Sequence, residues 1–194
     1  RIKNCIRYWI SNNNLSLPSR NILEQIYTTV LLAKNDAMPV VGWRRDGDKC
    51  EVRKYREFIF LLTGSVISDE LTLAESYSLV PDYTLTLPER LGRVSITQIS
   101  SNAGFDAQRL LDKPLSIRFR RGGERFRRTL NDHSQSLKHW FQEQGIPPWE
   151  RTFIPLVYRG DELIQVGNEI LDRSLKPQKK KISMQIHWIS DETA

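Results

Sequence analysis

Apolar positions recur with helical spacing at the start of the chain and alternate further on. Four apolar residues of segment 1–10 fall on one helical face: Ile2, Ile6, Trp9 and Ile10. The stretch NNNLSLPS ends this helix, and Ser19 is a good N-cap for a second one, whose apolar residues recur over 22–31. VVGWRRDGDKCEVRKY then predicts a hairpin that turns near Asp46-Gly47, and EFIFLL predicts a third strand.

From residue 83 onward the pattern predicts strands around one helix. YTLTLPERLGRVSITQI is typical of two strands, and LSIRFRR alternates like another. A helix is expected over about 134–144, marked by Leu137, Trp140 and Phe141. FIPLVYRGDELIQVG predicts a hairpin with Arg159–Glu162 at its tip, and KISMQIHWI predicts a closing strand.

Between these blocks, residues 63–82 show no clean period and a negative charge balance. We therefore expect a linker there, separating a domain at 1–62 from a domain at 83–194. The predicted fold class is α+β, with a small helical central domain and its β-meander followed by a mixed α/β C-terminal domain.

Composition places the chain among globular proteins, since 39% of its 194 residues are hydrophobic and five are Trp. It opens on Arg1 inside an apparent helix, which suggests a piece of a longer protein. Cys5 and Cys50 are isolated, so we expect buried thiols in a reduced, cytoplasmic protein rather than a zinc site. The longest apolar run is about ten residues, where a membrane span needs roughly 20.

Charge is distributed in blocks along the chain. The net charge is +5 over 1–60, −4 over 61–112, +6 over 113–142 and −3 over 143–175. Two basic blocks separated by an acidic one favour a polyanionic partner that contacts two regions. The alternative is chance clustering on solvated faces.

Catalytic motifs are missing from the sequence. It contains no Walker A motif, no GxGxxG and no arguable Ser/His/Asp set, and no metal site is expected. The three histidines have no partners at metal-ligand spacing: His133, His139 and His187. The chemistry that remains is a surface for binding.

The densest basic stretch is IRFRRGGERFRR at 117–128, with six arginines: Arg118, Arg120, Arg121, Arg125, Arg127 and Arg128. Strand alternation places Arg118 and Arg120 on one face, opposite Ile117 and Phe119. Arginine forks match phosphate oxygens, and a Gly122-Gly123 turn lets backbone N–H groups approach an anion. The alternative is a hairpin whose arginines only face water.

Further candidate contacts flank this stretch. Lys138 and His139 lie on the polar side or edge of the predicted helix, and Trp149 either stacks on a base or plugs the end of that helix. A secondary basic surface is expected on the first hairpin, at Arg44, Arg45, Arg53 and Lys54.

Residues 136–167, SLKHWFQEQGIPPWERTFIPLVYRGDELIQVG, resemble the C-terminal domain of the tRNA(Ile)-lysidine synthetase family. The shared features are Lys138, an aromatic-Gln-Glu, Pro147-Pro148-Trp149, Arg151, Pro-Leu and a Gly-Asp turn. RYWISNNNLSLPSRNILEQIY and EVRKY resemble the family's central domain. The chain departs from the family at TLNDHSQS, where a Gly/Arg-rich segment is frequent, and at His139, where a second lysine is usual.

The resemblance implies the tRNA-binding part of a ligase. The whole enzyme would use ATP, with Mg²⁺, to adenylate C2 of the wobble cytidine of a tRNA(Ile) with a CAU anticodon, and lysine would then displace AMP. The family's Ser-Gly-Gly-x-Asp-Ser loop is missing from this sequence, so this chain alone is expected to be inactive. The resemblance also implies that the C-terminal domain contacts the acceptor stem of the tRNA. It places Arg151 among the residues that contact the tRNA.

Two other functions stay open from the sequence. The chain could be a general RNA-binding or protein-interaction module with no ligase attached. A self-sufficient enzyme is disfavoured because no nucleophile, base or metal set is visible. Whether the protein forms a homodimer is also left open.

Overall fold

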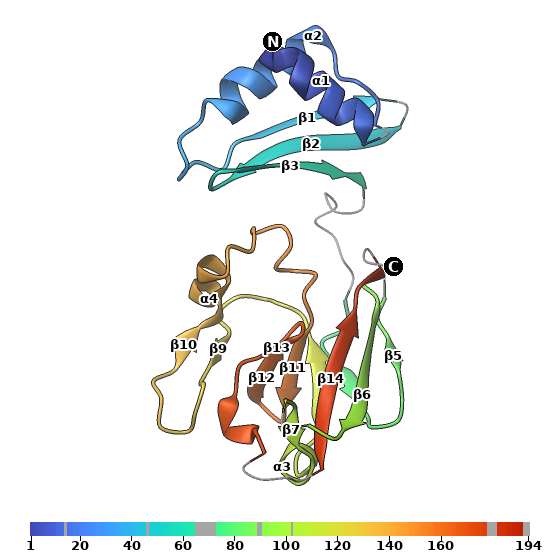
Figure 1. Ribbon diagram of the computed structural model, residues 1–194, viewed down its shortest axis with the longest axis vertical. Coiled ribbons are helices and arrows are strands. Elements are labelled where there is room, and N and C mark those ends of the chain that lie inside the picture. The colour runs from blue at the N-terminus through green and yellow to red at the C-terminus, as the bar shows by residue number, and fades with distance from the viewer. Residues whose placement is uncertain are drawn as a thin grey trace. The chain divides into compact units, whose positions relative to one another are not determined.

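The computed structural model describes residues 1–13, 15–45, 47–64, 73–88, 91–101, 103–177 and 182–191, with the side chains of Arg45 and Asp48 left out (Figure 1). The chain divides into two compact units, Arg1–Glu70 and Leu71–Ala194. Each unit combines helices with antiparallel strands, which confirms the predicted α+β class. No helix in the described ranges is long and apolar enough to cross a membrane.

The first unit is a three-stranded antiparallel meander with helices on one face (Figure 1). Its elements are α1 (Ile2–Asn12), α2 (Arg20–Gln25), the π-helix η1 (Ile26–Leu31), β1 (Val40–Arg45), β2 (Asp48–Tyr55) and β3 (Phe58–Thr63). The core lies between helices and sheet and includes Ile10, Ile26, Val30 and Val52. The predicted helices and three strands are confirmed, although Asp46 of the predicted turn lies outside the described residues.

Local chemistry explains how the second helix begins and why it changes. The Ser19 hydroxyl accepts a hydrogen bond from the N–H of Ile22 at 3.4 Å, which confirms the predicted N-cap. Thr28 Oγ1 donates to the Glu24 carbonyl at 2.9 Å. Such back-bonding competes with the backbone ladder, and the helix continues from Ile26 in π form.

The second unit contains two larger sheets and a two-stranded ribbon. One sheet has the order β13-β12-β11-β8-β4, the other β5-β6-β14-β7, and β9 pairs with β10. The elements are β4 (Tyr77–Leu79), β5 (Leu85–Thr86), β6 (Arg93–Ile99), β7 (Phe105–Asp106), α3 (Ala107–Leu111), β8 (Leu115–Arg118), β9 (Arg125–Phe126), β10 (Gln135–Ser136), α4 (Leu137–Glu143), β11 (Leu156–Arg159), β12 (Glu162–Val166), β13 (Glu169–Ile170), the 3₁₀-helix η3 (Arg173–Leu175) and β14 (Ser183–Ile189).

The five-stranded sheet is buried on both faces. Val157 and Ile164 pack with Ile96 and Ile186 of the four-stranded sheet in one apolar cluster. The neighbouring residues of the same strands pack against α4 in another cluster that includes Leu156, Leu163 and Phe141. Because both faces are buried, the sequences of β11 and β12 contain runs of consecutive apolar residues rather than a strict alternation. The predicted helix near 134–144 and the hairpin with its tip at Arg159–Glu162 are confirmed.

Part of the segment expected as a linker belongs to the second unit. Tyr77–Leu79 forms β4, an edge strand paired antiparallel with β8. A strand of three residues is too short to show a period in the sequence, which is why the pattern missed it. Residues 65–72 of the same segment lie outside the described ranges.

One prediction about the cysteines is wrong. Cys50 is buried in the core of the first unit, as expected, but Cys5 is exposed on α1. Cys5 lies one residue before the buried Ile6, and on a helix that neighbouring position points away from the core.

Candidate nucleic-acid interface

The arginine stretch does not form a hairpin, the shape that its alternative reading supposed. Ile117 and Arg118 are the last two residues of β8, which pairs with β11 and β4. Arg125 and Phe126 form β9, which pairs with β10. The Gly122-Gly123 turn therefore connects two different sheets. The alternation itself is confirmed, because Ile117 and Phe119 are buried while Arg118 and Arg120 are partly exposed.

Before the turn, each of three arginines lies close to a carboxylate. Arg118 is 3.6 Å from Asp161 Oδ1, Arg120 Nε is 3.9 Å from Glu124 Oε2, and Arg121 is 3.4 Å from Glu75 Oε1. Strong charge-assisted bonds are shorter, at about 2.7–2.9 Å. These three pairs are therefore weak, and two of the carboxylates, Glu75 and Asp161, are exposed.

The turn itself holds an anion that belongs to the chain. Gly122 and Gly123 have φ values of 102° and 85°, in the region that favours glycine. Glu124 Oε1 accepts hydrogen bonds from the backbone N–H of Arg121 and, at 2.7 Å, from that of Gly122. The anion-binding turn expected from Gly-Gly is thus present, and the Glu124 carboxylate fills it.

A cavity of about 350 Å³ opens beside this turn. It is lined by Glu75, Ser76, Arg118, Phe119, Arg121, Glu124 and Tyr158. The Arg118 guanidinium lies over the Tyr158 ring, 4.4 Å from its centroid, and donates to the Gly160 carbonyl at 3.2 Å. Burial raises the pKa of the Tyr158 phenol above 10.0, helped by Glu124 and opposed by Arg118.

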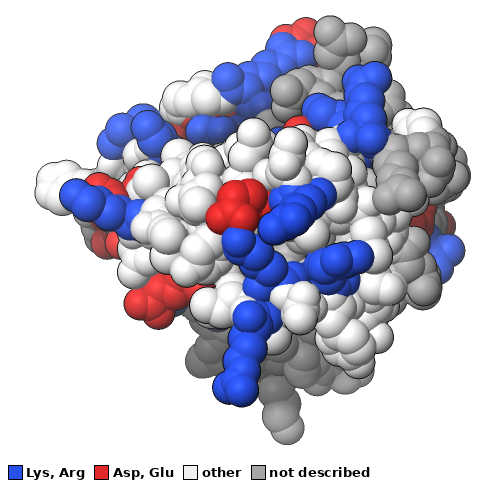
Figure 2. Space-filling view, turned by 90° about the horizontal axis from the view of Figure 1, so that it is seen from above, with Lys and Arg blue, Asp and Glu red and all other residues white. Residues whose placement is uncertain are grey.

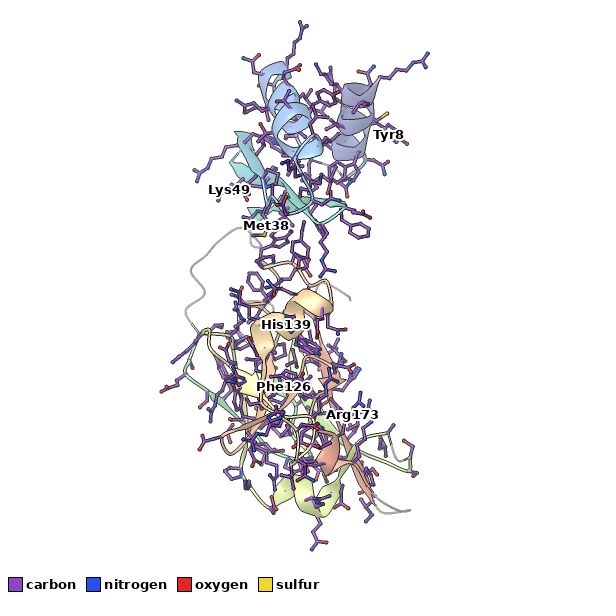
Figure 3. All side chains as sticks on the ribbon, turned by 90° about the vertical axis from the view of Figure 1, so that its left-hand side faces the viewer. Tyr8, Met38, Lys49, Phe126, His139 and Arg173 are labelled. Atoms are coloured by element: carbon purple, nitrogen blue, oxygen red, sulfur yellow. The ribbon has the colours of Figure 1, made fainter. Side chains whose placement is uncertain are left out.

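After the turn, the arginines have fewer acidic neighbours. Arg125 donates to Ser134 Oγ at 2.9 Å and to the Ser134 carbonyl at 2.6 Å, which ties β9 to β10. Arg128 lies 6.0 Å from the centroid of the Phe126 ring, which is buried inside the second unit (Figure 3). Arg127 is exposed, and no ion pair or hydrogen bond of its side chain is found within the part of the chain that the structure describes.

Helix α4 adds two exposed side chains next to this segment. Lys138 is exposed, and His139 Nε2 lies 3.2 Å from Glu143 Oε1, one helical turn along. The opposite side of the helix is buried through Leu137, Trp140 and Phe141. The predicted orientation of Lys138 and His139 is therefore confirmed, while their contact with RNA stays a prediction.

Arg151 and Trp149 serve the fold in this structure. Arg151 is only 4% exposed, and its Nε and one terminal nitrogen donate to the Ile146 carbonyl at 2.8 and 2.6 Å. Its guanidinium also lies 5.7 Å from the centroid of the Phe141 ring. Trp149 is half-buried with its indole nitrogen shielded from solvent, which favours the plug over the stacking platform. We therefore leave both residues out of the contact surface.

The secondary surface expected on the first hairpin is largely used internally. Lys54 is 8% exposed and its ammonium donates to the Ala33 carbonyl. Arg53 donates to Glu51 Oε2 at 2.8 and 2.6 Å. Arg44 is exposed, and the side chain of Arg45 lies outside the described residues. Burial and pairing thus remove Lys54 and Arg53 from that surface.

A different basic site, which the sequence analysis missed, lies between the helices of the first unit. A cavity of about 540 Å³ is lined by Lys3, Asn4, Arg7, Pro18, Arg20, Leu23 and Glu24. Lys3 pairs with Glu24, which leaves the cavity with a net positive charge. Figure 2, which views the first unit from the side of α1 and α2, shows Lys and Arg side chains gathered over these helices. The sequence did contain a sign of this site, because Lys3 and Arg7 are four residues apart and therefore lie on the same face of a helix.

Metal chemistry finds no support in the described residues. They contain no group of three or more His, Cys, Asp or Glu side chains arranged to hold a metal ion. The candidate interface combines cations with carboxylates, glycine backbone and aromatic rings.

Comparison with known families adds independent findings. Residues 1–60 match the family model described as the TilS substrate binding domain, and residues 115–188 match the TilS substrate C-terminal domain. The helix cavity lies in the first match, and the arginine stretch with α4 lies in the second.

Similar proteins bear the name tRNA(Ile)-lysidine synthase, as the synthetase is also called. A relative from Legionella pneumophila (strain Lens) is 33% identical over 84% of this chain and 35% of its own. A relative from Proteus mirabilis (strain HI4320) is 34% identical over 84% of this chain and 35% of its own. A relative from Salmonella agona (strain SL483) is 32% identical over 91% of this chain and 38% of its own. The chain thus spans about a third of these relatives.

A solved structure described as the crystal structure of TILS C-terminal domain also aligns with the chain. It covers 59% of this chain and 98% of its own, at 23% identity and a TM-score of 0.46.

Proposed function

This chain belongs to the tRNA(Ile)-lysidine synthase (TilS) family, whose substrate-binding and C-terminal domains it carries, and we propose that it holds the tRNA substrate of the whole enzyme. One observation supports this most: each of the two matched domains presents a separate cluster of exposed cations beside a cavity. Polyanionic RNA is the partner that such clusters favour.

Two clusters suit a large substrate better than one. The helix site consists of Lys3, Arg7 and Arg20 in the first unit. The arginine site consists of Arg121, Arg127 and Lys138, which are exposed and belong to the arginine stretch and to the helix that follows it. Holding one tRNA at two points restricts its motion, and such positioning lowers the entropic part of a reaction barrier.

We propose that the ligation reaction takes place in the part of the relatives that this chain does not match. There, ATP with Mg²⁺ activates C2 of the wobble cytidine of a tRNA(Ile) with a CAU anticodon, and lysine displaces AMP. This chain would contribute position and orientation to that cytoplasmic reaction and no reacting group. Its expected lack of ATP–pyrophosphate exchange on its own is measurable directly.

The experiment compares three sets of substitutions to Gln in the 194-residue chain. The sets are Lys3/Arg7/Arg20, Arg121/Arg127/Lys138 and the control Arg93/Arg173/Lys176, which removes the same charge from exposed positions that belong to neither site. Fluorescence anisotropy with labelled tRNA(Ile) at several salt concentrations gives the affinity and its salt slope. Each lost phosphate contact reduces the slope by about 1.

We expect both site sets to weaken binding and flatten the salt slope more than the control set. Equal affinities and slopes for all three sets would overturn the two-site proposal. The runner-up, a general RNA-binding or protein-interaction module, predicts that unrelated duplex RNA competes as well as tRNA(Ile). Sedimentation of the free chain and of its tRNA complex decides whether a homodimer forms.

A further inference from the structure

The Gly-Gly turn of the second unit already binds an anion, the carboxylate of Glu124. Two successive backbone N–H groups, of Arg121 and Gly122, converge on its Oε1. Successive N–H groups that converge in this way form an anion-binding concavity. The Glu124 side chain is 10% exposed, so the carboxylate is held in place rather than solvated.

The carboxylate satisfies this concavity incompletely. Its Oε2 lies 3.9 Å from Arg120 Nε, and that buried nitrogen has no hydrogen-bond partner within the described residues. A carboxylate offers two oxygens in a plane, whereas a phosphate group offers its oxygens tetrahedrally. Because of this geometry, a phosphate group can direct an oxygen toward a donor that the planar Glu124 carboxylate leaves unpaired.

The surroundings of the turn suit exchange of one anion for another. The adjoining cavity of about 350 Å³ is lined by Arg118 and Arg121, whose carboxylate partners Asp161 and Glu75 are exposed and at distances of 3.4 Å or more. Exposed pairs of this kind contribute little to stability. Breaking these two ion pairs therefore costs little, although Arg118 also gives up its hydrogen bond to the Gly160 carbonyl if it turns toward an incoming anion.

We propose that Glu124 is an internal competitor that occupies the binding site of one RNA phosphate group. When RNA binds, the phosphate accepts hydrogen bonds from the backbone N–H groups of Arg121 and Gly122 and from Arg120 Nε, and it pairs with Arg118 and Arg121. The Glu124 carboxylate moves into solvent. The Glu124 carboxylate thereby weakens the binding of free small anions at this turn. An RNA can still displace it, because the RNA is also held by contacts elsewhere on the protein. This inference rests on the proposed function, because it deepens the role of the arginine site in binding RNA.

The test replaces Glu124 by Gln, which keeps an acceptor for the turn and removes the charge. The control is Glu169→Gln, the same charge change at an exposed position on β13 that does not line the cavity. Inorganic phosphate is titrated into each protein while the backbone amide signals of Arg121 and Gly122 are followed by NMR. Thermal unfolding of both variants verifies that they are folded.

We expect E124Q to bind phosphate about tenfold more tightly than the wild type, with the largest shifts at those two amides, because a competing like charge is gone. E169Q should match the wild type. If E124Q and E169Q give the same phosphate affinity, or if the two amides do not respond in E124Q, Glu124 is only a turn cap and the inference is wrong.

A second arm uses tRNA(Ile) with either a 5′-phosphate or a 5′-hydroxyl. E124Q should bind the phosphorylated tRNA more tightly than E169Q does. A gain that disappears with the 5′-hydroxyl identifies the terminal phosphate, and a gain that persists identifies an internal phosphodiester. Because the first arm contains no RNA, a wild-type chain that fails to bind tRNA would overturn the proposed function without deciding the anion exchange.

Discussion

Two arginine-bearing segments of the second unit use the same side chain for opposite purposes. In 118–128 the arginines lie at the surface around a glycine turn, and Arg127 and Arg121 face solvent. In 146–159, Arg151 and Arg159 are 4% and 8% exposed. Arg159 donates to the Arg109 carbonyl and to the carboxylates of Asp112 and Glu162. The difference lies in what surrounds each guanidinium rather than in the residue type.

The comparison teaches how to separate arginines that bind from those that stabilise. A buried guanidinium must have its hydrogen bonds satisfied within the protein, so it is not available to a ligand. An exposed guanidinium gains little from its own protein and retains its capacity for phosphate. Substitutions in the two segments should therefore affect different measurements, stability in one and affinity in the other.

The largest expected effect is that of Arg151→Ala on stability. The substitution removes two hydrogen bonds to the Ile146 carbonyl and the contact with Phe141, so the free energy of unfolding should fall by about 3 kcal/mol. Urea unfolding measures it. Arg127→Ala, the control, should change stability by less than about 0.5 kcal/mol. An R151A protein that stays fully stable but loses tRNA affinity would show that Arg151 belongs to the contact surface after all.

The same contrast extends to the first unit through Lys54→Ala. Its buried ammonium satisfies the Ala33 carbonyl, and removal of the side chain should cost about 2 kcal/mol of stability. The tRNA affinity of the folded variant should stay at the wild-type value. Arg44→Ala, at an exposed position on the same sheet, is the matched control. A loss of affinity in K54A at unchanged stability would contradict the assignment of Lys54 to the fold.

Arg125 should show an intermediate behaviour. Its two hydrogen bonds to Ser134 tie the ribbon of β9 and β10, so Arg125→Gln should cost about 1 kcal/mol of stability and also weaken tRNA binding. Arg127→Gln should weaken binding roughly three- to tenfold with no change in stability. Anisotropy and urea unfolding on both variants separate the two contributions. If the two variants lose the same stability and the same tRNA affinity, the proposed difference between the roles of Arg125 and Arg127 is wrong.

The smallest effect concerns the acid stability of the first unit. Burial would raise the pKa of Glu51, but its hydrogen bonds and charge interactions with Arg53 and Lys49 outweigh burial and hold this pKa below 4.5. Glu51 therefore contributes stability that is present above pH 4.5 and is lost as the pH falls through its lowered folded-state pKa. Stability measured from pH 6 to 3 should decline less steeply in Glu51→Gln. An unchanged slope would show that this carboxylate is not linked to folding.

Much of the fold was predictable because burial leaves a periodic trace in the sequence. The Ser19 cap, the apolar face of the first helix and the hairpin at Arg159–Glu162 each depend on residues close in sequence. The three-residue strand β4 left no such trace, and the pairing of β9 with β10 rather than β8 depends on partners far from the turn.

By itself, the sequence determined the longer helices and strands, the alternation of Ile117 and Phe119 against Arg118 and Arg120, and the resemblance that later matched two TilS domains. Only the tertiary structure decided which cations remain available. Arg151 and Lys54 became part of the interior, the helix site emerged from Lys3, Arg7 and Arg20, and Glu124 filled the turn. The reason is physical: whether a charged side chain is available to a ligand depends on the atoms that surround it after folding, and the order of residues along the chain does not show which atoms those are.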